Sequence, residues 1–233
     1  MLSKPVKHLR YEQLVTERKA CQFCSQYALT NPSCIDVPAD SERIGPYSLW
    51  QGNLDSPLVV VGQDFADVDG YQINMGWPGE NVGTNLTLVK LVAEAGLNIS
   101  APKKGASEDV IFCTNAVLCL KQGGMQAAVR SVCYSACGKR FLRPLIELIK
   151  PKAVATLGSG ALKAILRAYE IENSSSLLNL LDSGRTFDLS GGVRLFPMAH
   201  PSKSVLNITR SLETQLSDWR KLGAYLESSK GSF

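Results

Sequence analysis

Four short segments of nearly continuous hydrophobic residues interrupt the mixed hydrophobic and polar pattern of the chain. They cover residues 58–62, 110–114, 153–157 and 193–198. β-Branched residues are frequent in these segments, and apolar positions do not alternate strictly with polar ones. Strands of this kind are typical of parallel sheets that helices cover on both faces. The pattern therefore predicts four buried parallel strands.

The regions between and after these strands have apolar residues at helical spacing instead. Residues 84–95 predict one amphipathic helix, and residues 125–149 predict a helix or a pair of helices. Two further helices are expected over residues 161–169 and 211–226. Strands that alternate with helices predict an α/β fold, here a three-layer αβα sandwich around a central four-stranded parallel sheet.

The length of 233 residues suits one such domain. No internal repeat or long linker divides the sequence, so we expect a single domain over residues 1–233. Its first part, residues 1–56, precedes the first predicted strand and carries cysteines. We therefore treat it as a cysteine-bearing N-terminal extension of that domain.

Composition narrows the class of protein without naming a function. Hydrophobic residues make up 45% and charged residues 20% of the chain, which are ordinary globular values. No apolar run approaches the roughly 20 residues that span a bilayer, and the basic N-terminus lacks the apolar stretch of a secretion signal. We expect a cytoplasmic protein with no membrane partner. A net charge of +4 permits nucleic-acid binding but does not require it.

Polar residues with useful chemistry follow three of the predicted strands. In sheets of this class, ligands bind beyond the carboxyl ends of the strands. Asp64 follows the first strand, Asn115 ends the second, and His200 follows the fourth. Each has a structural alternative, because aspartate and asparagine often cap loops or helices and a single histidine is often structural. His8, the other histidine, lies near the N-terminus and is a poor candidate.

Two further features are weaker. Gly158 and Gly160 follow the third strand, but Lys163 stands where a dinucleotide fingerprint has its third glycine. A dinucleotide-dependent enzyme remains an alternative on this motif. Lys121 and three other scattered lysines are interpreted as solvated surface residues.

The cysteine spacing is typical of metal or cluster ligation in a cytosolic chain. Cys21 and Cys24 form a C-x2-C pair. A second set consists of Cys113, Cys119, Cys133 and Cys137. Four thiolates suffice for a 4Fe–4S cluster or a structural zinc ion, whereas buried unligated thiols are the plain alternative. Cys113 fits that alternative because it lies inside a predicted strand, and Cys34 is expected to take no part.

Taken in order, the strand-end motifs resemble the uracil-DNA glycosylase superfamily. Residues 62–64 (GQD) are similar to the start of the GQDPYH motif of the classical enzymes. Residues 115–118 (NAVL) resemble their LNAVLT segment, and residues 200–202 (HPS) resemble the start of their second motif.

The cysteine framework is similar instead to the iron–sulfur branch of that superfamily. The resemblance implies a 4Fe–4S cluster, with zinc as the alternative. The implied ligands are Cys21, Cys24, Cys119 and Cys137. Cys133 is a rival for the fourth position because it lies one helical turn before Cys137.

The resemblance implies a monofunctional glycosylase that hydrolyses the N-glycosidic bond of uracil in single- or double-stranded DNA. Asp64 would stabilise the cationic sugar and position water, and His200 would donate a hydrogen bond to the leaving base. The Asn115 carboxamide would select the base, because its adjacent donor and acceptor match an edge of uracil and mismatch cytosine. Gln63 would contribute its backbone N–H, and Ser202 would hold a flanking phosphate.

The sequence departs from the family pattern around the base. Ala66 stands where the classical enzymes have a tyrosine that excludes the thymine methyl group, so 5-substituted or oxidised bases are also expected substrates. Trp77 is the expected stacking platform, with Phe65 and Tyr71 as rivals and a role as a loop anchor as the structural alternative.

Three assignments stay open. The wedge that fills the vacated stack is expected to be Val205 or Leu206. The enzyme alternative is the same fold acting on another deaminated base, such as hypoxanthine or xanthine. The alternative of a different class is a non-catalytic nucleic-acid-binding or redox-sensing module.

Overall fold

The protein is described by a computed structural model covering residues 3–37, 43–103 and 109–229. Its centre is a five-stranded sheet with the strand order β3-β2-β5-β7-β6. The strands of this sheet are β2 (Leu58–Gly62), β3 (Phe112–Asn115), β5 (Ala153–Leu157), β6 (Phe187–Leu189) and β7 (Val193–Met198). A separate antiparallel pair is formed by β1 (Leu29–Thr30) and β4 (Leu120–Lys121).

The predicted α/β sandwich is confirmed, with one difference in the sheet. β3, β2, β5 and β7 are parallel and correspond to the four predicted strands. The fifth strand, β6, pairs antiparallel with β7 at the edge. Its three residues contain two buried apolar side chains around the exposed Asp188, which is too short a pattern to distinguish from a loop.

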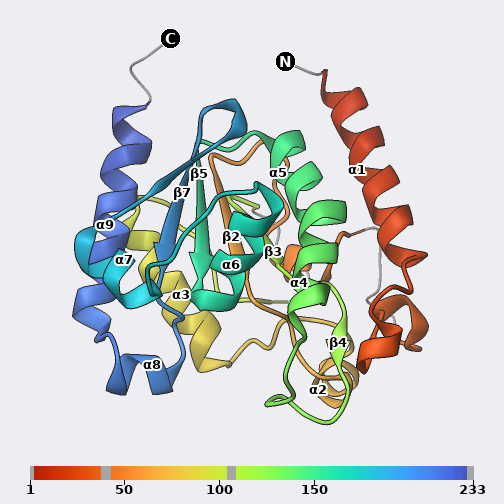
Figure 1. Cartoon of the computed structure of the whole chain (residues 1–233). Coiled ribbons are helices and arrows are strands. Elements are labelled where there is room, and N and C mark those ends of the chain that lie inside the picture. Colours follow the sequence, from red (N-terminus) through yellow and green to blue (C-terminus); the bar gives the residue numbers. More distant parts are fainter. Residues whose placement is uncertain (1–2, 38–42, 104–108, 230–233) are drawn as a thin grey trace.

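Helices cover both faces of the sheet (Figure 1). The α-helices of the described residues are α1 (Lys4–Lys19), α2 (Val68–Ile73), α3 (Gly83–Glu94), α4 (Ser131–Cys137), α5 (Arg143–Ile149), α6 (Gly158–Ala168), α7 (Leu177–Ser183), α8 (Lys203–Ile208) and α9 (Leu212–Ser228). A π-helical turn, η4 (Gly138–Leu142), joins α4 to α5. The helices expected over residues 84–95, 161–169 and 211–226 correspond to α3, α6 and α9, and the pair expected within 125–149 begins only at Ser131.

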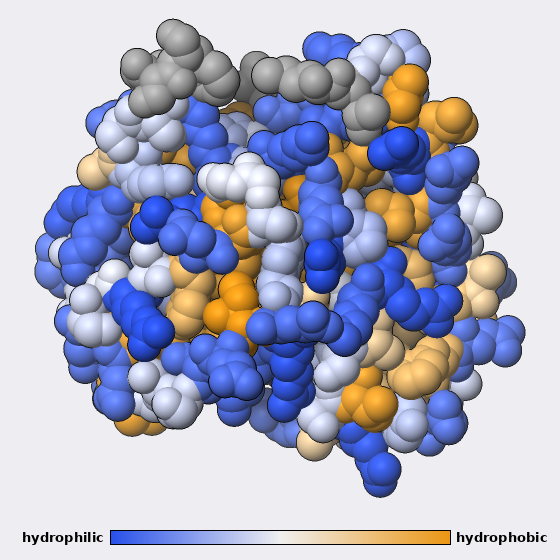
Figure 2. Space-filling model, turned by 45° about the horizontal axis from the view of Figure 1, so that its top comes forward, coloured by the Kyte–Doolittle hydropathy of each residue, from blue (hydrophilic) through white to orange (hydrophobic). Residues whose placement is uncertain are grey.

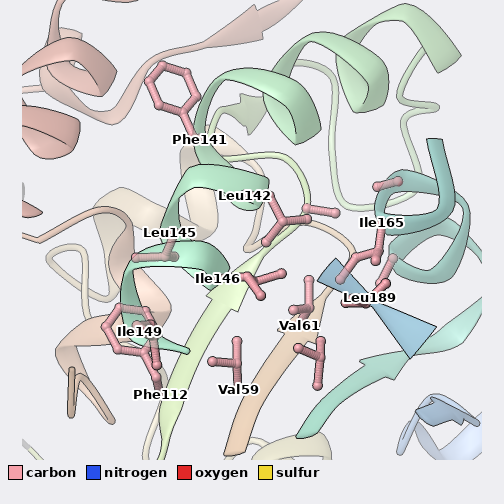
Figure 3. Close-up of a cluster of buried hydrophobic side chains, with 14 of the residues drawn as sticks. Val59, Val61, Phe112, Phe141, Leu142, Leu145, Ile146, Ile149, Ile165 and Leu189 are labelled. Atoms are coloured by element: carbon pink, nitrogen blue, oxygen red, sulfur yellow. The ribbon is translucent and has the colours of Figure 1, made fainter. Parts of the chain in front are cut away.

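Alternate residues of the strands build two hydrophobic layers. Val59 and Val61 of β2 face the layer that includes α1, α5 and α6, whereas Leu58 and Val60 face the layer that includes α3 and α9. Figure 3 shows the first layer, where Val59 and Val61 lie among side chains of the helices. Because apolar side chains cover both strand faces, the hydrophobic runs in the sequence are continuous.

Helix α1 belongs to the N-terminal extension and packs against the domain through Tyr11 and Val15. Its hydrophobic contribution is small, since its buried residues are Tyr11, Val15 and Arg18. Arg18 donates to the backbone carbonyl of Arg43 at 2.9 Å, and the Tyr11 hydroxyl accepts from the Ile44 N–H at 3.0 Å. These hydrogen bonds join α1 to residues 43 and 44, which belong to the same N-terminal extension.

The two ends of the molecule hold different helices and strands. The parallel strands run toward the end that holds α2, β4 and α8, while α1 begins and α9 ends at the opposite end (Figure 1). The view that brings this opposite end forward is mainly hydrophilic, with apolar side chains in separate small patches (Figure 2). Within residues 3–37, 43–103 and 109–229, no helix has the length and hydrophobicity needed to cross a membrane.

Candidate active site

A cavity of about 530 Å3 opens at the carboxyl ends of the parallel strands. It is lined by residues from the loop after β2, from the end of β3, from β4 and from the end of β7. Among its lining residues are Gln63, Asp64, Phe65, Ala66, Trp77, Asn115, Lys121 and His200. Six of the seven predicted catalytic and substrate-binding residues therefore share one cavity, and their roles there remain predictions.

The ends of β2 and β3 hold Asn115 at the cavity wall. Gly62 is the parallel partner of Asn115, and beyond the strands the Ala116 N–H donates to the Gly62 carbonyl at 2.8 Å. A Cβ at Gly62 would lie 2.6 Å from the Asn115 side-chain nitrogen, closer than real Cβ contacts. Glycine at position 62 therefore leaves the space that the buried Asn115 carboxamide occupies.

Asp64 forms a buried ion pair that the sequence did not suggest. Its Oδ1 lies 2.8 Å from the Nζ of Lys121, and the two side chains are 7% and 6% exposed. Its Oδ2 accepts a hydrogen bond from the Gln63 side-chain amide at 2.9 Å. The interpretation of Lys121 as a solvated surface residue was wrong, because the short strand β4 turns this side chain into the cavity.

The sequence around Lys121 gives only a weak indication that this lysine is buried. It follows the apolar segment Leu118–Cys119–Leu120, all of which is buried, and it is itself 5% exposed. A lysine at the end of a buried segment, on a strand of two residues, carries no periodic pattern that separates it from a surface lysine. Only the pairing of β4 with β1 and its contact with the loop after β2 bring it to Asp64.

His200 is held as a neutral imidazole. The backbone N–H of Ser202 donates to His200 Nδ1 at 3.2 Å, so this nitrogen is the acceptor and Nε2 carries the proton. Burial lowers the pKa of His200 below its ordinary value, and the charge of Asp64 opposes that shift. The ring therefore presents an N–H donor near neutral pH.

Ser202 and the predicted wedge residues lie outside the cavity lining. Ser202 immediately precedes α8, and its hydroxyl lies 3.2 Å from that of Ser204. Val205 and Leu206 are half-buried on the same helix. The contribution of Ser202 to the cavity is its backbone N–H, which orients His200.

Of the three candidate stacking residues, two line the cavity. Trp77 and Phe65 are half-buried there, whereas Tyr71 is fully buried and is not among the lining residues. Tyr71 packs edge-on against Phe65, with ring centroids 6.2 Å apart. Tyr71 thus packs against Phe65, and its own ring is not accessible from the cavity.

Asp67, a second carboxylate in the loop after β2, and Gly160 of the incomplete dinucleotide motif have structural roles. Asp67 caps α2 by accepting from the Gly70 N–H at 2.8 Å, the structural role that aspartate after a strand often has. Gly160, in the incomplete dinucleotide motif, lies directly beneath the Gln63 side chain, which fills the space that a Cβ would need. A phosphate could not approach Gly160 unless Gln63 moved.

The four cysteines predicted as cluster ligands line a second, much smaller cavity of about 10 Å3. Cys21 and Cys24 come from the turn after α1, Cys119 precedes β4, and Cys137 ends α4. Cys24 is hydrogen-bonded to Cys119, and this contact together with burial raises the pKa of Cys24. Cys133 also contacts Cys24, and burial raises the pKa of Cys133 to about 12.

The donor set of this small cavity consists of cysteine thiols. Among the described residues, no three or more Cys, His, Asp or Glu side chains are arranged to hold one metal ion. A zinc ion binds all of its ligands itself, whereas each thiolate of a 4Fe–4S cluster binds a different iron atom. Four thiols line this cavity, and the identity of the group that they hold stays a prediction.

Comparison with family models gives a match over most of the chain. No curated protein matches the chain. The family model described as the uracil DNA glycosylase superfamily matches residues 49–222, which include the loops that carry Asp64, Asn115 and His200. The match spans well over half of the 233 residues and contains every strand of the central sheet. The chain therefore belongs to the uracil DNA glycosylase superfamily.

Proposed function

We propose that this protein is a monofunctional DNA glycosylase that hydrolyses the N-glycosidic bond of uracil and leaves an abasic site. Superfamily membership supports a glycosylase-type reaction and DNA as the partner. The observation that carries the finer proposal is that Asp64, Asn115 and His200 line one cavity at the carboxyl ends of the strands. A carboxylate, a carboxamide and a neutral imidazole are the groups that hydrolysis of a pyrimidine nucleoside needs.

In this proposal the three side chains act on different parts of the substrate. Breaking the glycosidic bond leaves a cationic sugar and an anionic base, as in other glycoside hydrolyses. Asp64 stabilises the sugar cation and orients the attacking water, and His200 donates its Nε2–H to the oxygen of the leaving base. Asn115 recognises the base edge through its adjacent donor and acceptor.

The base must leave the duplex stack before it reaches the cavity. Unstacking costs a few kcal/mol, and an aromatic platform offsets about 1–3 kcal/mol of it per stacked base. We propose Trp77 as that platform, with Phe65 as its rival, because both line the cavity. Leu206 and Val205 on α8 remain the proposed wedge.

We propose a base range wider than uracil. Ala66 is a small side chain at the cavity wall where the classical enzymes carry a tyrosine, so a substituent at C5 meets less steric exclusion. Hypoxanthine and xanthine define the alternative substrate class. A panel of oligonucleotides that carry each base once decides between these ranges.

We also propose that Cys21, Cys24, Cys119 and Cys137 hold a 4Fe–4S cluster. The iron ions of such a cluster are positively charged and bind cysteine thiolates. The cluster would have a structural role here. Thiols that are buried and close together disfavour the charged form, as the raised pKa values of Cys24 and Cys137 reflect. Binding iron reverses that preference because metal ligation requires deprotonated thiols.

The direct test is incubation with single- and double-stranded oligonucleotides that contain one uracil, followed by alkali cleavage. We expect strand cleavage only after alkali, because a monofunctional enzyme leaves the abasic strand intact. Asp64→Asn should lower the rate of base release at least about a hundredfold while DNA binding persists. Asp69→Asn, at an exposed carboxylate of α2 outside the cavity, is the matched control and should keep the wild-type rate.

Other outcomes decide against the proposal. Tight DNA binding by the wild type without release of any base would favour the non-catalytic module. An Asp64→Asn variant with full activity would remove Asp64 from the reaction and direct attention to Asp67. Strand cleavage without alkali would contradict the monofunctional assignment.

A further inference from the structure

Lys121 combines three properties that are unusual for a lysine in a loop-rich region. Its side chain is 6% exposed, it lines the cavity, and its ammonium group lies 2.8 Å from Asp64 Oδ1. The same ammonium donates to the backbone carbonyl of Met125, and the Lys121 backbone N–H donates to the Ala66 carbonyl at 3.1 Å. The side chain is thus fixed at both of its ends.

We propose that Lys121 is a positioning residue for the glycosylase reaction, because its ammonium group holds the Asp64 carboxylate in one orientation at the cavity wall. This inference rests on the proposed function and adds a residue that the superfamily motifs do not include. Lys121 acts through Asp64 and needs no contact with the substrate.

The surroundings of Asp64 make a nearby cation necessary. A carboxylate with 7% of its side chain exposed has lost most of its water, and an isolated buried charge is strongly unfavourable. The Gln63 amide supplies a neutral hydrogen bond to Oδ2. Among the described residues, Lys121 is the basic group for which an ion pair with Asp64 is found.

The other titratable groups around Asp64 do not replace that cation. His200 interacts electrostatically with Asp64 but is held neutral by burial. Tyr134 also faces the Asp64 charge, which together with burial raises the tyrosine pKa. Asp67 is directed toward the Gly70 N–H at the start of α2. Removing the Lys121 ammonium would therefore leave a desolvated carboxylate beside neutral or anionic groups.

The orientation of the carboxylate follows from the same contacts. Lys121 engages one oxygen and Gln63 the other, so rotation of the carboxylate would break at least one interaction. Water that attacks the sugar must be oriented in the transition state, and small misplacements of a catalytic group are costly. Loss of Lys121 should therefore lower kcat and change KM little, as expected for an interaction expressed in the transition state.

The test compares Lys121→Met, Lys121→Arg and Lys121→Ala with the wild type in uracil release from full-length protein. We expect Lys121→Met to lower kcat about tenfold or more with KM nearly unchanged, and Lys121→Arg to keep more activity because it retains the charge. Propylamine should restore activity to Lys121→Ala, whereas propanol, a neutral molecule of similar size, should not. Lys152→Met is the matched control, since Lys152 also donates to a backbone carbonyl, that of Ser229 at 2.8 Å, but lies outside the cavity.

Each other result overturns the inference in a recognisable way. A wild type that releases no base refutes the proposed function and this inference together. An active wild type with an equally active Lys121→Met refutes only the role of Lys121. Rescue of Lys121→Ala by propanol as well as propylamine would show that the lysine only fills space.

A covalent role is tested separately. Trapping of wild-type protein on uracil-containing DNA by sodium borohydride, lost in Lys121→Met, would make Lys121 a nucleophile and overturn the positioning role. If Lys121→Met does not fold, amine rescue of Lys121→Ala and the activity of Lys121→Arg still decide the question.

Discussion

His200 shows how two local interactions set the chemical state of one side chain. The Ser202 N–H fixes the acceptor nitrogen of the ring, and burial disfavours its protonated form. Protonation would place a hydrogen on Nδ1, directly facing the Ser202 N–H, and that hydrogen bond would be lost. The same two interactions therefore favour a neutral ring that can donate from Nε2.

This state has a consequence for stability that can be measured. Because the pKa of His200 is lowered in the folded protein, the unfolded chain binds the proton first as pH falls below the ordinary histidine value of about 6.5. The free energy of unfolding should therefore decrease from about pH 6.5 downward and show no contribution from His200 above it.

Urea unfolding of wild type and His200→Gln between pH 8 and pH 5, a range chosen to bracket the histidine value of about 6.5, measures this contribution. The wild type should lose more stability than His200→Gln on acidification. His8→Gln, at the exposed histidine of α1, is the control and should behave as the wild type does. Equal acid sensitivity of wild type and His200→Gln would contradict the prediction.

At the scale of elements, the carboxyl ends of β2 and β3 form the frame of the cavity. Their parallel pairing continues past the strands, since the Val117 N–H donates to the Gln63 carbonyl at 3.0 Å. The two loops are therefore held together by backbone hydrogen bonds, and the side chains of Asp64 and Asn115 start from fixed positions. The close approach of Asn115 to Gly62 depends on this arrangement.

Gly62→Ala should reduce base release about tenfold to a hundredfold, because the new methyl group displaces the Asn115 carboxamide. Loss of stability should be modest, since Gly62 lies at the end of its strand. Gly83→Ala is the matched control, because a Cβ there meets no atom within 4 Å. Steady-state kinetics and thermal unfolding of both variants check the prediction. Full activity of Gly62→Ala would show that Asn115 is not needed where it lies.

The elements also show what the sequence can and cannot predict. β2, β5 and β7 were predictable because their hydrophobic runs are continuous, which burial between two helical layers requires. β6 was missed because its three residues are too few to show a pattern. α1 was missed because only Tyr11, Val15 and Arg18 of its residues are buried. Helix α7 was not among the predicted helices, although Leu180 and Leu181 are buried in it.

The same reasoning separates the predictable and unpredictable parts of the candidate site. Polar residues at the carboxyl ends of parallel strands share one edge of the sheet, so Asp64, Asn115 and His200 could be grouped from chain order alone. Lys121 could not, because its position depends on the pairing of two two-residue strands. Ser202 was expected to hold a flanking phosphate; its side chain lies at the start of α8, outside the cavity lining, and that role stays a prediction.

At the scale of the whole molecule, the cysteines connect parts that are far apart in the sequence. The turn after α1 meets the segment before β4 and the end of α4 around one small cavity. A cluster at this place would join the N-terminal extension to the helical layer. Its presence should therefore affect the stability of the whole chain more than the chemistry of the active site.

We expect anaerobically purified protein to show broad visible absorbance and to contain iron and sulfide. Cys137→Ser should lose both and unfold at a lower temperature, because Cys137 lines the cavity with the other three thiols. Cys133→Ser should keep its iron, and Cys34→Ser, at an exposed cysteine, is the control. Iron lost from Cys133→Ser but retained in Cys137→Ser would reverse the ligand assignment. Zinc in place of iron would refute the cluster.

The polarity of the fold has a practical consequence for experiments with long DNA. Because α1 begins and α9 ends at the end of the molecule opposite α2, β4 and α8, an affinity tag at either terminus is attached far from the cavity (Figure 1). Protein immobilised through such a tag would turn the cavity away from its support. Single-molecule recording of lesion search on stretched DNA is thus feasible with either end tethered.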